Sequence, residues 1–411
     1  MKQSKLLFII SLLFSVLISC SKDSAPNGSE KLAEQKPIII SAAIANNITD
    51  FSFDFFKTLQ TDPAVNSDAF VSPLSLHMAL GMLVNGATAE TKAEIMKTLK
   101  SENLSQTELN ETYKKLLKEL PEVDPKVKMA LANSIWYKNG YTVEPAFLTN
   151  MKDYFNAKVA GLAFAPSDTS YINGWARDNT NGKINKVLSN FDDNLIMLLM
   201  NALYFKGDWT TQFDPKKTSD QPFTLENGTN KTVKMMNQQD SFEYASFIDY
   251  YVLRMPYGNG QFVATLILPK VSKTISGVFN EFDATKWNDV QNNLQKQTVI
   301  VGVPKFKLTQ EFSLNNTLKK MGMQKAFSDG AEFGGILKNE PIKVSFIKQN
   351  TFVAVDEVGT EAAAVTTIGM VTTSLPSYPS FICNRPFGFI ISEKTSNTIL
   401  FMGRVMNPEA N

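Results

Sequence analysis

The chain carries few of the residues from which hydrolytic active sites are usually built. Its only histidine is His77, which lies between Leu76 and Met78 in an apolar stretch. A Ser-His-Asp or Cys-His enzyme would need His77 as its general base, whereas the apolar neighbours favour a structural histidine in a packed helix. A single histidine and two widely separated cysteines exclude histidine clusters and do not supply a zinc site.

Carboxylates and charge point to no other catalytic chemistry. The 40 acidic residues would suffice for a carboxylate metal site or a glycosidase pair, but no motif clusters them. No glycine-rich loop precedes a helix in a phosphate-binding pattern. With 41 basic residues and a net charge of +1, the chain has no basic footprint for nucleic acid. We therefore predict that the chain is not an enzyme and needs no metal or cofactor, and we keep a carboxylate-dependent surface hydrolase as a distant alternative.

The stretch Thr351–Thr373 has a composition that suits two different conformations. Its first part, Thr351–Asp356, is rich in β-branched and apolar residues and predicts a buried strand. From Gly359 onward the side chains are mostly small, with no charge after Glu361. The stretch then enters Ser374–Ser380, a proline-containing loop that cannot join a central sheet. Such a segment can be a loop in one state and a strand in another.

The spacing within this stretch favours insertion between strands that are already packed. In a strand, alternate residues face the same side, so Thr360, Ala362, Ala364, Thr366 and Ile368 would share one face. A charge buried there without a partner would cost several kcal/mol, and a proline would remove a ladder hydrogen bond. The sequence has neither.

Several segments resemble the serpin family, in the family's order and over nearly all of the mature chain. EVGTEAAA (357–364) is similar to the reactive-loop hinge, and Phe381–Pro408 to the C-terminal strands. Phe70–Leu99 and KGDW (Lys206–Trp209) resemble the second and third helices and the place where the central sheet opens. The resemblance implies an α+β serpin fold with three β-sheets, about eight or nine helices and an exposed reactive loop at about 357–380. No internal repeat or linker divides residues 38–411, which we expect to form one domain.

The resemblance also implies a function and the residues that carry it. A serpin traps a protease as an acyl-enzyme while the cleaved loop inserts into the sheet. The hinge would be formed by Glu357, Gly359, Thr360, Glu361, Ala362, Ala363 and Ala364. The family spacing places the scissile bond at Thr373-Ser374, with Met370, Val371 and Leu375 as alternatives. No Arg or Lys lies between Glu361 and Arg385, so we expect an elastase-like or other serine protease with a small or apolar preference, or a cysteine protease.

Further positions match serpin residues that control opening of the sheet. Ser72, Ser75 and Asn201 correspond to polar residues under the centre of the sheet, and Trp209 corresponds to the tryptophan where the loop enters. Gln349 stands where the family usually has a histidine, and glutamine both donates and accepts hydrogen bonds. The main alternative is a non-inhibitory serpin that acts as a cell-surface binding protein.

The N-terminus predicts export and lipid anchoring. Lys2 and Lys5 precede the apolar run Leu6–Ile18, which at 13 residues is shorter than a membrane span. The sequence around Cys20 resembles a bacterial lipobox. We predict a lipoprotein signal peptide (1–19), a flexible tether (20–37) attached through Cys20, and an outer-membrane lipoprotein that is surface-exposed or faces the periplasm. We expect a monomer.

Periodicity gives a coarse element map. We expect a helix over Asn47–Leu59 and another that starts at Ser72, the latter with a serine cap followed by proline. Ile196–Phe205 predicts a strand buried on both faces, and Val299–Leu308 is again predicted to be β. By resemblance, Tyr171–Leu188 forms the helix that crosses the central sheet.

Overall fold

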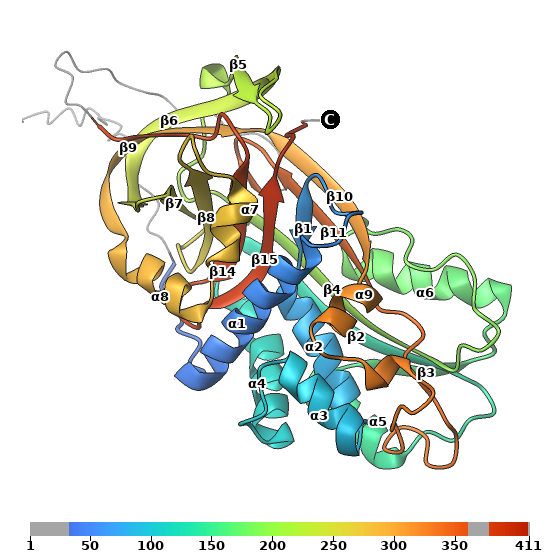
Figure 1. Cartoon of the computed structure of the whole chain (residues 1–411). Helices are drawn as coiled ribbons and strands as arrows, with labels where there is room; N and C mark the ends of the chain where they lie inside the picture. Colours follow the sequence, from blue (N-terminus) through green and yellow to red (C-terminus); the bar gives the residue numbers. More distant parts are fainter. Residues whose placement is uncertain (1–32, 361–377, 410–411) are drawn as a thin grey trace, which may run out of the picture. The chain divides into compact units, whose positions relative to one another are not determined.

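The structure is a computed structural model, and it describes residues 33–360 and 378–409. These residues form nine α-helices and two hydrogen-bonded β-sheets (Figure 1). The helices are α1 (Ala42–Leu59), α2 (Pro73–Val84), α3 (Ala89–Thr98), α4 (Gln106–Glu119), α5 (Pro145–Phe155), α6 (Pro166–Asn179), α7 (Ile275–Asn280), α8 (Ala284–Asn293) and α9 (Asn315–Lys320). This confirms the predicted α+β class.

A six-stranded sheet, here called the central sheet, is the frame of the candidate site. Its order is β10 (Phe306–Ser313), β11 (Lys348–Val355), β12 (Gly359–Thr360), β4 (Met197–Asp208), β2 (Val127–Lys138) and β3 (Lys158–Leu162). Neighbouring strands are antiparallel except β2 and β3, which are parallel.

The second sheet is larger and includes the C-terminal strands. Its order is β1 (Ala69–Val71), β15 (Thr398–Val405), β14 (Phe387–Glu393), β8 (Phe262–Pro269), β7 (Tyr250–Pro256), β6 (Asn230–Ser246), β9 (Gln295–Pro304) and β13 (Ser380–Ile382), and β5 (Ser219–Thr224) pairs with β6. The long strand β6 pairs with β5 near its start and with β7 at its end. Two of the three expected sheets are thereby joined through β6.

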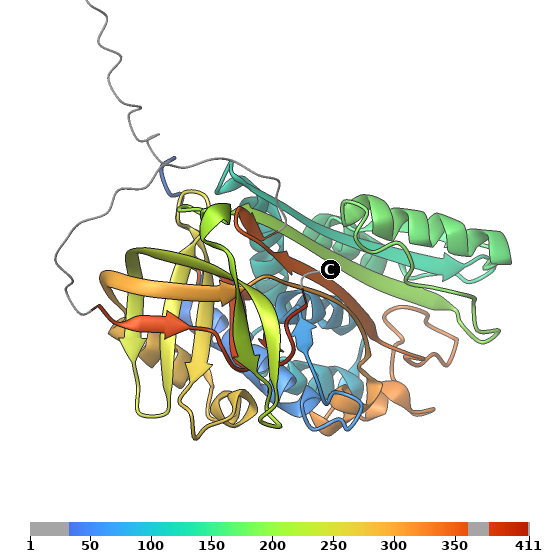
Figure 2. The same cartoon turned by 90° about the horizontal axis from the view of Figure 1, so that it is seen from above.

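Helix α2 lies between the two sheets, in contact with β4 and β15 (Figure 2). Ser72 caps it as the sequence predicts, because its Oγ accepts a hydrogen bond from the Ser75 backbone N–H and Pro73 occupies the first turn. Nearly every side chain of α2 is buried, as expected for a helix packed on two sides.

The opposite face of the central sheet is covered by α6. A separate apolar cluster fills this interface and includes Trp136, Ile172, Trp175 and Leu198. The helix is shorter than the predicted Tyr171–Leu188, because Asn181 and Gly182 have positive φ angles of 50° and 77° and end it.

The stretch Val299–Leu308, which the sequence predicts to be β, contains the end of one strand and the start of another. The chain leaves β9 at Pro304 and enters β10 at Phe306, in different sheets. The predicted tether (20–37) overlaps residues that are bound to the body. Gln35 Nε2 donates to the Asn259 carbonyl at 3.0 Å, and Lys36 N donates to Gln261 Oε1 at 2.9 Å.

Within residues 33–360 and 378–409, the helices are too short or too polar to cross a membrane. The same residues contain no cluster of three or more histidine, cysteine or carboxylate side chains suited to a metal ion.

Candidate functional site: an open edge in the central sheet

The predicted hinge begins as a two-residue strand inside the central sheet. Gly359 pairs with Asp208 and Thr360 pairs with Gly207 of β4, while Thr360 also pairs with Val355 of β11. The first residues of the loop are therefore already placed between β4 and β11, at one end of the space that a longer inserted strand would occupy.

Gly359 is required by the close approach of β12 to β4. A Cβ atom at this position would lie 2.1 Å from the Gly207 carbonyl oxygen and 2.7 Å from the Asp208 Cα. Both neighbours are backbone atoms and cannot turn aside as a flexible side chain would. Any other residue would force β12 away from β4.

Thr360 is buried and is held by an aromatic pair. Its Oγ1 is hydrogen-bonded to the Tyr257 hydroxyl at 2.6 Å. Tyr257 stacks on Trp209 with ring centroids 4.4 Å apart, and Trp209 Nε1 donates to the Asp356 carbonyl at 3.0 Å. Burial raises the pKa of Tyr257 far above its usual value, so its hydroxyl stays neutral. Trp209 thus lies beside β12 and the turn that precedes it.

Glu357 anchors the turn that leads into β12. It forms an ion pair with Lys305 at 2.8 Å, accepts a hydrogen bond from Thr218 at 2.9 Å, and its carbonyl accepts from Phe213 N at 2.8 Å. Burial alone would raise the pKa of Glu357, but the hydrogen bonds from Lys305, the backbone and Thr218, together with the charge of Lys305, outweigh burial and lower the pKa. Burial raises the pKa of the neighbouring Asp356, whose carboxylate accepts from Val358 N and Gly359 N.

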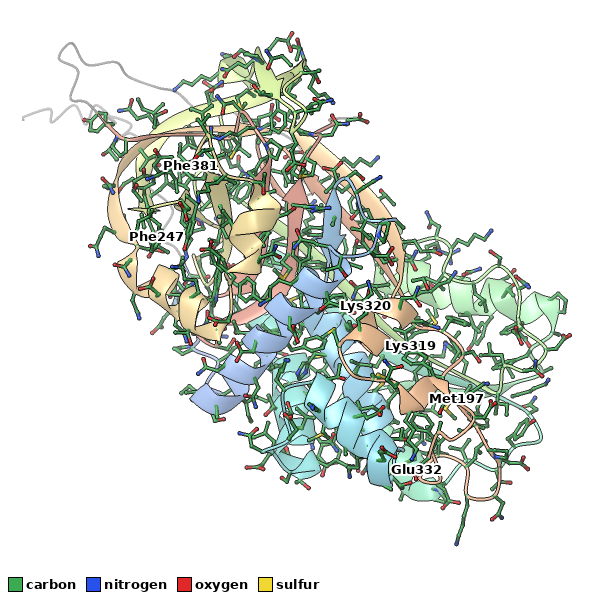
Figure 3. The ribbon with its side chains drawn as sticks, in the orientation of Figure 1. Met197, Phe247, Lys319, Lys320, Glu332 and Phe381 are labelled. Atoms are coloured by element: carbon green, nitrogen blue, oxygen red, sulfur yellow. The ribbon has the colours of Figure 1, made fainter. Side chains whose placement is uncertain are left out.

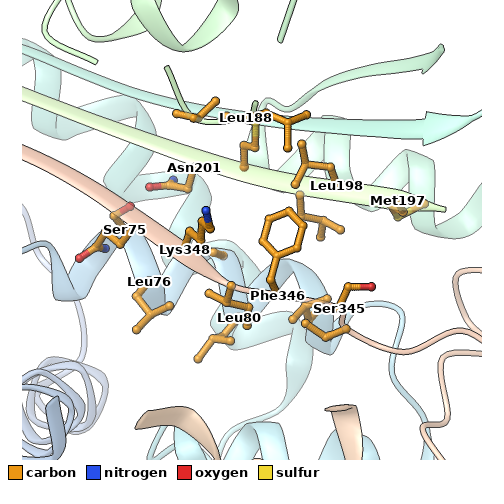
Figure 4. A pocket seen from close by; sticks show the side chains of 18 of the residues that line it. Ser75, Leu76, Leu80, Leu188, Met197, Leu198, Asn201, Ser345, Phe346 and Lys348 are labelled. Atoms are coloured by element: carbon orange, nitrogen blue, oxygen red, sulfur yellow. The ribbon is translucent and has the colours of Figure 1, made fainter. Parts of the chain in front are cut away.

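Beyond β12, the facing edges of β4 and β11 pair with no strand of the described residues. β4 pairs with β2 along its other edge, and β11 pairs with β10 along its other edge. The space between them is a cavity of about 390 Å³ with α2 on one side (Figure 4). It extends toward Met197, which lies at the end of the body opposite to Phe381 (Figure 3). Because Met197 and Leu199 line it, β4 is less buried than the sequence predicts.

The polar residues predicted under the sheet all line this cavity, in two separate groups. Gln349 Nε2 donates to the Ser72 carbonyl at 2.8 Å and Ser72 N donates to Gln349 Oε1 at 2.9 Å. Ser75 joins this group through Ser72. Asn201 belongs to the other group and donates to Asn133 Oδ1 at 2.7 Å. The Oδ1 of Asn201 is buried and has no hydrogen-bond partner among the described residues.

Comparison with known proteins agrees with this geometry. Residues 46–408 match the family model described as serpin (serine protease inhibitor). The chain belongs to the serpin family. Human neuroserpin is 33% identical over 374 residues, which cover 88% of this chain and 91% of neuroserpin. The native state of tengpin, a thermophilic serpin, superposes with a TM-score of 0.83 at 31% identity, covering 91% of this chain and 96% of tengpin.

Another similar structure is that of human thyroxine-binding globulin complexed with thyroxine. It has a TM-score of 0.81 at 28% identity and covers 89% of this chain and 98% of that protein. The family is thus described by protease inhibition, while one similar structure holds thyroxine.

Several predicted residues lie outside the described part of the chain or outside the site. Glu361, Ala362, Ala363, Ala364, the scissile pair Thr373-Ser374, the alternatives Met370, Val371 and Leu375, and Cys20 lie outside the described residues. His77 is fully buried, and Tyr113 is hydrogen-bonded to its Nδ1 at 2.8 Å. Cys383 is buried and burial raises its thiol pKa, which suits a structural role.

Sequence reasoning missed Lys305, Tyr257 and Asn133. Lys305 lies where the chain passes from β9 in one sheet to β10 in the other. The only signal of this position in the sequence is that Pro304 and Lys305 interrupt an apolar run. Tyr257 precedes an Asn-Gly turn, which predicts a hairpin but not a contact with Thr360. Asn133 opposes Asn201 in the ladder, and two asparagines within apolar strands are the signal that would have paired them.

Proposed function

We propose that this serpin is an inhibitor that traps proteases by inserting its cleaved reactive loop between β4 and β11. The observation that carries the proposal is the strand β12, which already pairs with both strands while their edges beyond it are open. Strand addition to an open edge gains a full set of ladder hydrogen bonds. The native state would then persist because conversion is slow and not because it has the lowest free energy.

The register of β12 supports insertion over a longer stretch. If the pairing of Thr360 with Gly207 and Val355 continued along the loop, Thr366, six residues after Thr360, would pair with the residues six positions before those partners. These residues are Asn201 in β4 and Gln349 in β11. Directly paired residues in an antiparallel ladder share a face, so Thr366 would face the polar residues of the cavity. Its hydroxyl would supply the missing donor to Asn201 Oδ1.

The target is an elastase-like or other serine protease that prefers small or apolar residues, and the scissile bond is Thr373-Ser374. The absence of Arg and Lys between Glu361 and Arg385 supports this choice against a trypsin-like target. We further propose that the chain is a monomeric lipoprotein, anchored through Cys20 to the outer membrane of a bacterium. Loss of acyl-group labelling in a Cys20→Ser variant would test the anchor.

Denaturing gels test the inhibitory proposal. The protein from Ser21 onward is mixed with pancreatic elastase, chymotrypsin, subtilisin and papain. The proposal expects a band at the combined mass with at least one protease, together with a released C-terminal peptide that begins at Ser374. Cleavage within the loop by all four proteases without such a band would contradict it and favour the non-inhibitory alternative, a cell-surface binding protein.

A further inference from the structure

The cavity between β4 and β11 contains a hydrogen-bond acceptor that no group of the described residues satisfies. Asn133 Nδ2 donates to the Phe155 carbonyl at 2.7 Å, which leaves Asn133 Oδ1 to accept from Asn201 Nδ2 at 2.7 Å. These two bonds fix both amides, so the atom of Asn201 that stays buried without a partner is its Oδ1, an acceptor. A buried polar atom of this kind calls for a donor.

A hydroxyl group reaches the same cavity from α2. Ser75 lines the cavity, and its backbone N–H is bonded to Ser72 Oγ. The Oγ of Ser75 itself takes part in no hydrogen bond within residues 33–360 and 378–409. A hydroxyl can both donate and accept. The cavity therefore offers a ligand one acceptor and one hydroxyl.

Away from these two groups, the walls of the cavity are apolar. Asn201, Leu199 and Met197 share one face of β4 because alternate residues of a strand do so. Leu199 and Met197 pack against the main core, to which α2 contributes. Figure 4 shows Asn201 and Ser75 toward one side of the cavity and Met197 toward the other. The residues of α2 that line the cavity form one helical stripe: Ser75, Leu76, Ala79, Leu80 and Leu83. The cavity is thus polar at one end and apolar along the rest.

The charges at the cavity leave nothing for an anionic ligand. Among the described residues, the charged side chains that line it are Lys343 and Lys348. Lys343 is paired with Asp329 and Lys348 with Glu311, and the two lysine side chains are 49% and 41% exposed. They therefore lie where the cavity meets solvent, and their charges are already compensated.

The polar end and the size of the cavity define the class of ligand. A hydroxyl head group can donate to Asn201 Oδ1 and accept from Ser75 Oγ, whereas a carboxylate has no donor and would set its oxygens against Asn201 Oδ1. The volume of about 390 Å³ is within the usual range of ligand pockets, and an apolar cavity of about 150 Å³ already binds benzene. The cavity has room for an alkyl chain of medium length.

We propose that the cavity between β4 and β11 binds a neutral amphiphile, with its hydroxyl head between Asn201 and Ser75 and its alkyl chain along β4 and α2. Burial of the alkyl chain supplies the affinity. An occupied cavity would also delay the insertion of a strand between β4 and β11. This delay rests on the proposed function, whereas the binding does not.

Calorimetric titration of the full chain tests the binding without a protease. The probes are 1-octanol, its methyl ether and octanoate, which differ mainly in the head group. We expect saturable binding of 1-octanol at one site. The ether should bind about tenfold more weakly, because it has no donor and leaves Asn201 Oδ1 unpaired. Octanoate should show no measurable binding, because its charge would be buried without a partner.

Substitutions locate the site. Ala79→Leu places a larger side chain into the cavity from α2 and should weaken 1-octanol binding by about tenfold, the usual size of overpacking. Ala45→Leu is the matched control and should bind as the wild-type chain does, because Ala45 is also a half-buried helical alanine but does not line the cavity. Asn201→Leu should abolish the preference for the alcohol over the ether.

Three results would overturn the proposal: no saturable binding of 1-octanol, equal affinity for the alcohol and the ether in the wild-type chain, or unchanged binding in Ala79→Leu. The comparison of head groups uses the wild-type chain, so it decides the matter even if a variant does not fold. With a protease that the chain traps, saturating 1-octanol should lower the yield of trapped complex on denaturing gels, and octanoate should not. An unchanged yield despite measured binding would overturn the delay of insertion, and a lack of trapping by any protease would count against the proposed function alone.

Discussion

Replacing Gly359 by alanine should remove β12 from the central sheet. The new Cβ would lie 2.1 Å from the Gly207 oxygen, more than 1 Å closer than a normal contact, and this oxygen belongs to the backbone and cannot turn aside. Thr360 alone would lose three interactions, namely its ladder pairings with Gly207 and with Val355 and its side-chain bond to Tyr257. At about 1 kcal/mol each, the loss is about 3 kcal/mol, which is about a 150-fold change in the population of the paired hinge.

Hydrogen exchange and inhibition assays measure the two consequences of this change. Protection of the Gly359 and Thr360 amides should fall by about two orders of magnitude, and more inhibitor should be consumed per protease trapped, because the hinge must enter the sheet anew. Gly334→Ala is the matched control, since a Cβ at Gly334 meets no atom within 4 Å. If Gly359→Ala kept the protection and the stoichiometry of Gly334→Ala, the reasoning from the close approach would be refuted.

Four further changes test other parts of the account. Thr360→Arg would bury an unpaired charge in place of a 2% exposed threonine, and gels should show a cleaved substrate in place of a trapped complex. Burial lowers the pKa of His77 to about 4, below its unfolded value, so protonation favours unfolding and stability should fall by about 2 kcal/mol between pH 7.5 and pH 5. Urea midpoints should show this slope in the wild-type chain and lose it in His77→Gln. Glu357→Gln removes the ion pair with Lys305 and should lower the free energy of unfolding by about 1 kcal/mol, measured by chemical denaturation; an unchanged midpoint would show that the pair adds nothing. Gln261→Ala removes two hydrogen bonds to Lys36, and proteolysis before Ile38 should become faster than in the wild-type chain.

The local signals in the sequence located much of the fold. Ser72-Pro73 marks the start of α2 because a capping side chain and a proline act within one turn. The apolar run Ile196–Phe205 marks β4, and Thr351–Asp356 marks β11. Such elements depend on neighbouring residues, so the chain order alone reveals them.

Features that depend on distant residues were harder to predict. The ion pair of Glu357 joins residues 52 positions apart, and the bond between Tyr257 and Thr360 joins residues 103 apart. The sequence and its family resemblance suggested that Ser72, Ser75, Asn201 and Gln349 act together. All four residues line one cavity. Asn201, however, is hydrogen-bonded to Asn133 and not to the other three, because the ladder register places Asn133 opposite it.

The melting temperature before and after cleavage of the loop tests the central claim most directly. The protein from Ser21 onward is cut within residues 361–377 by a protease that it does not trap, and both forms are heated under the same conditions. Insertion between β4 and β11 predicts that the cleaved form melts at a clearly higher temperature than the intact form, because the open edges gain a strand. A cleaved form that melts at the same or a lower temperature would contradict the account.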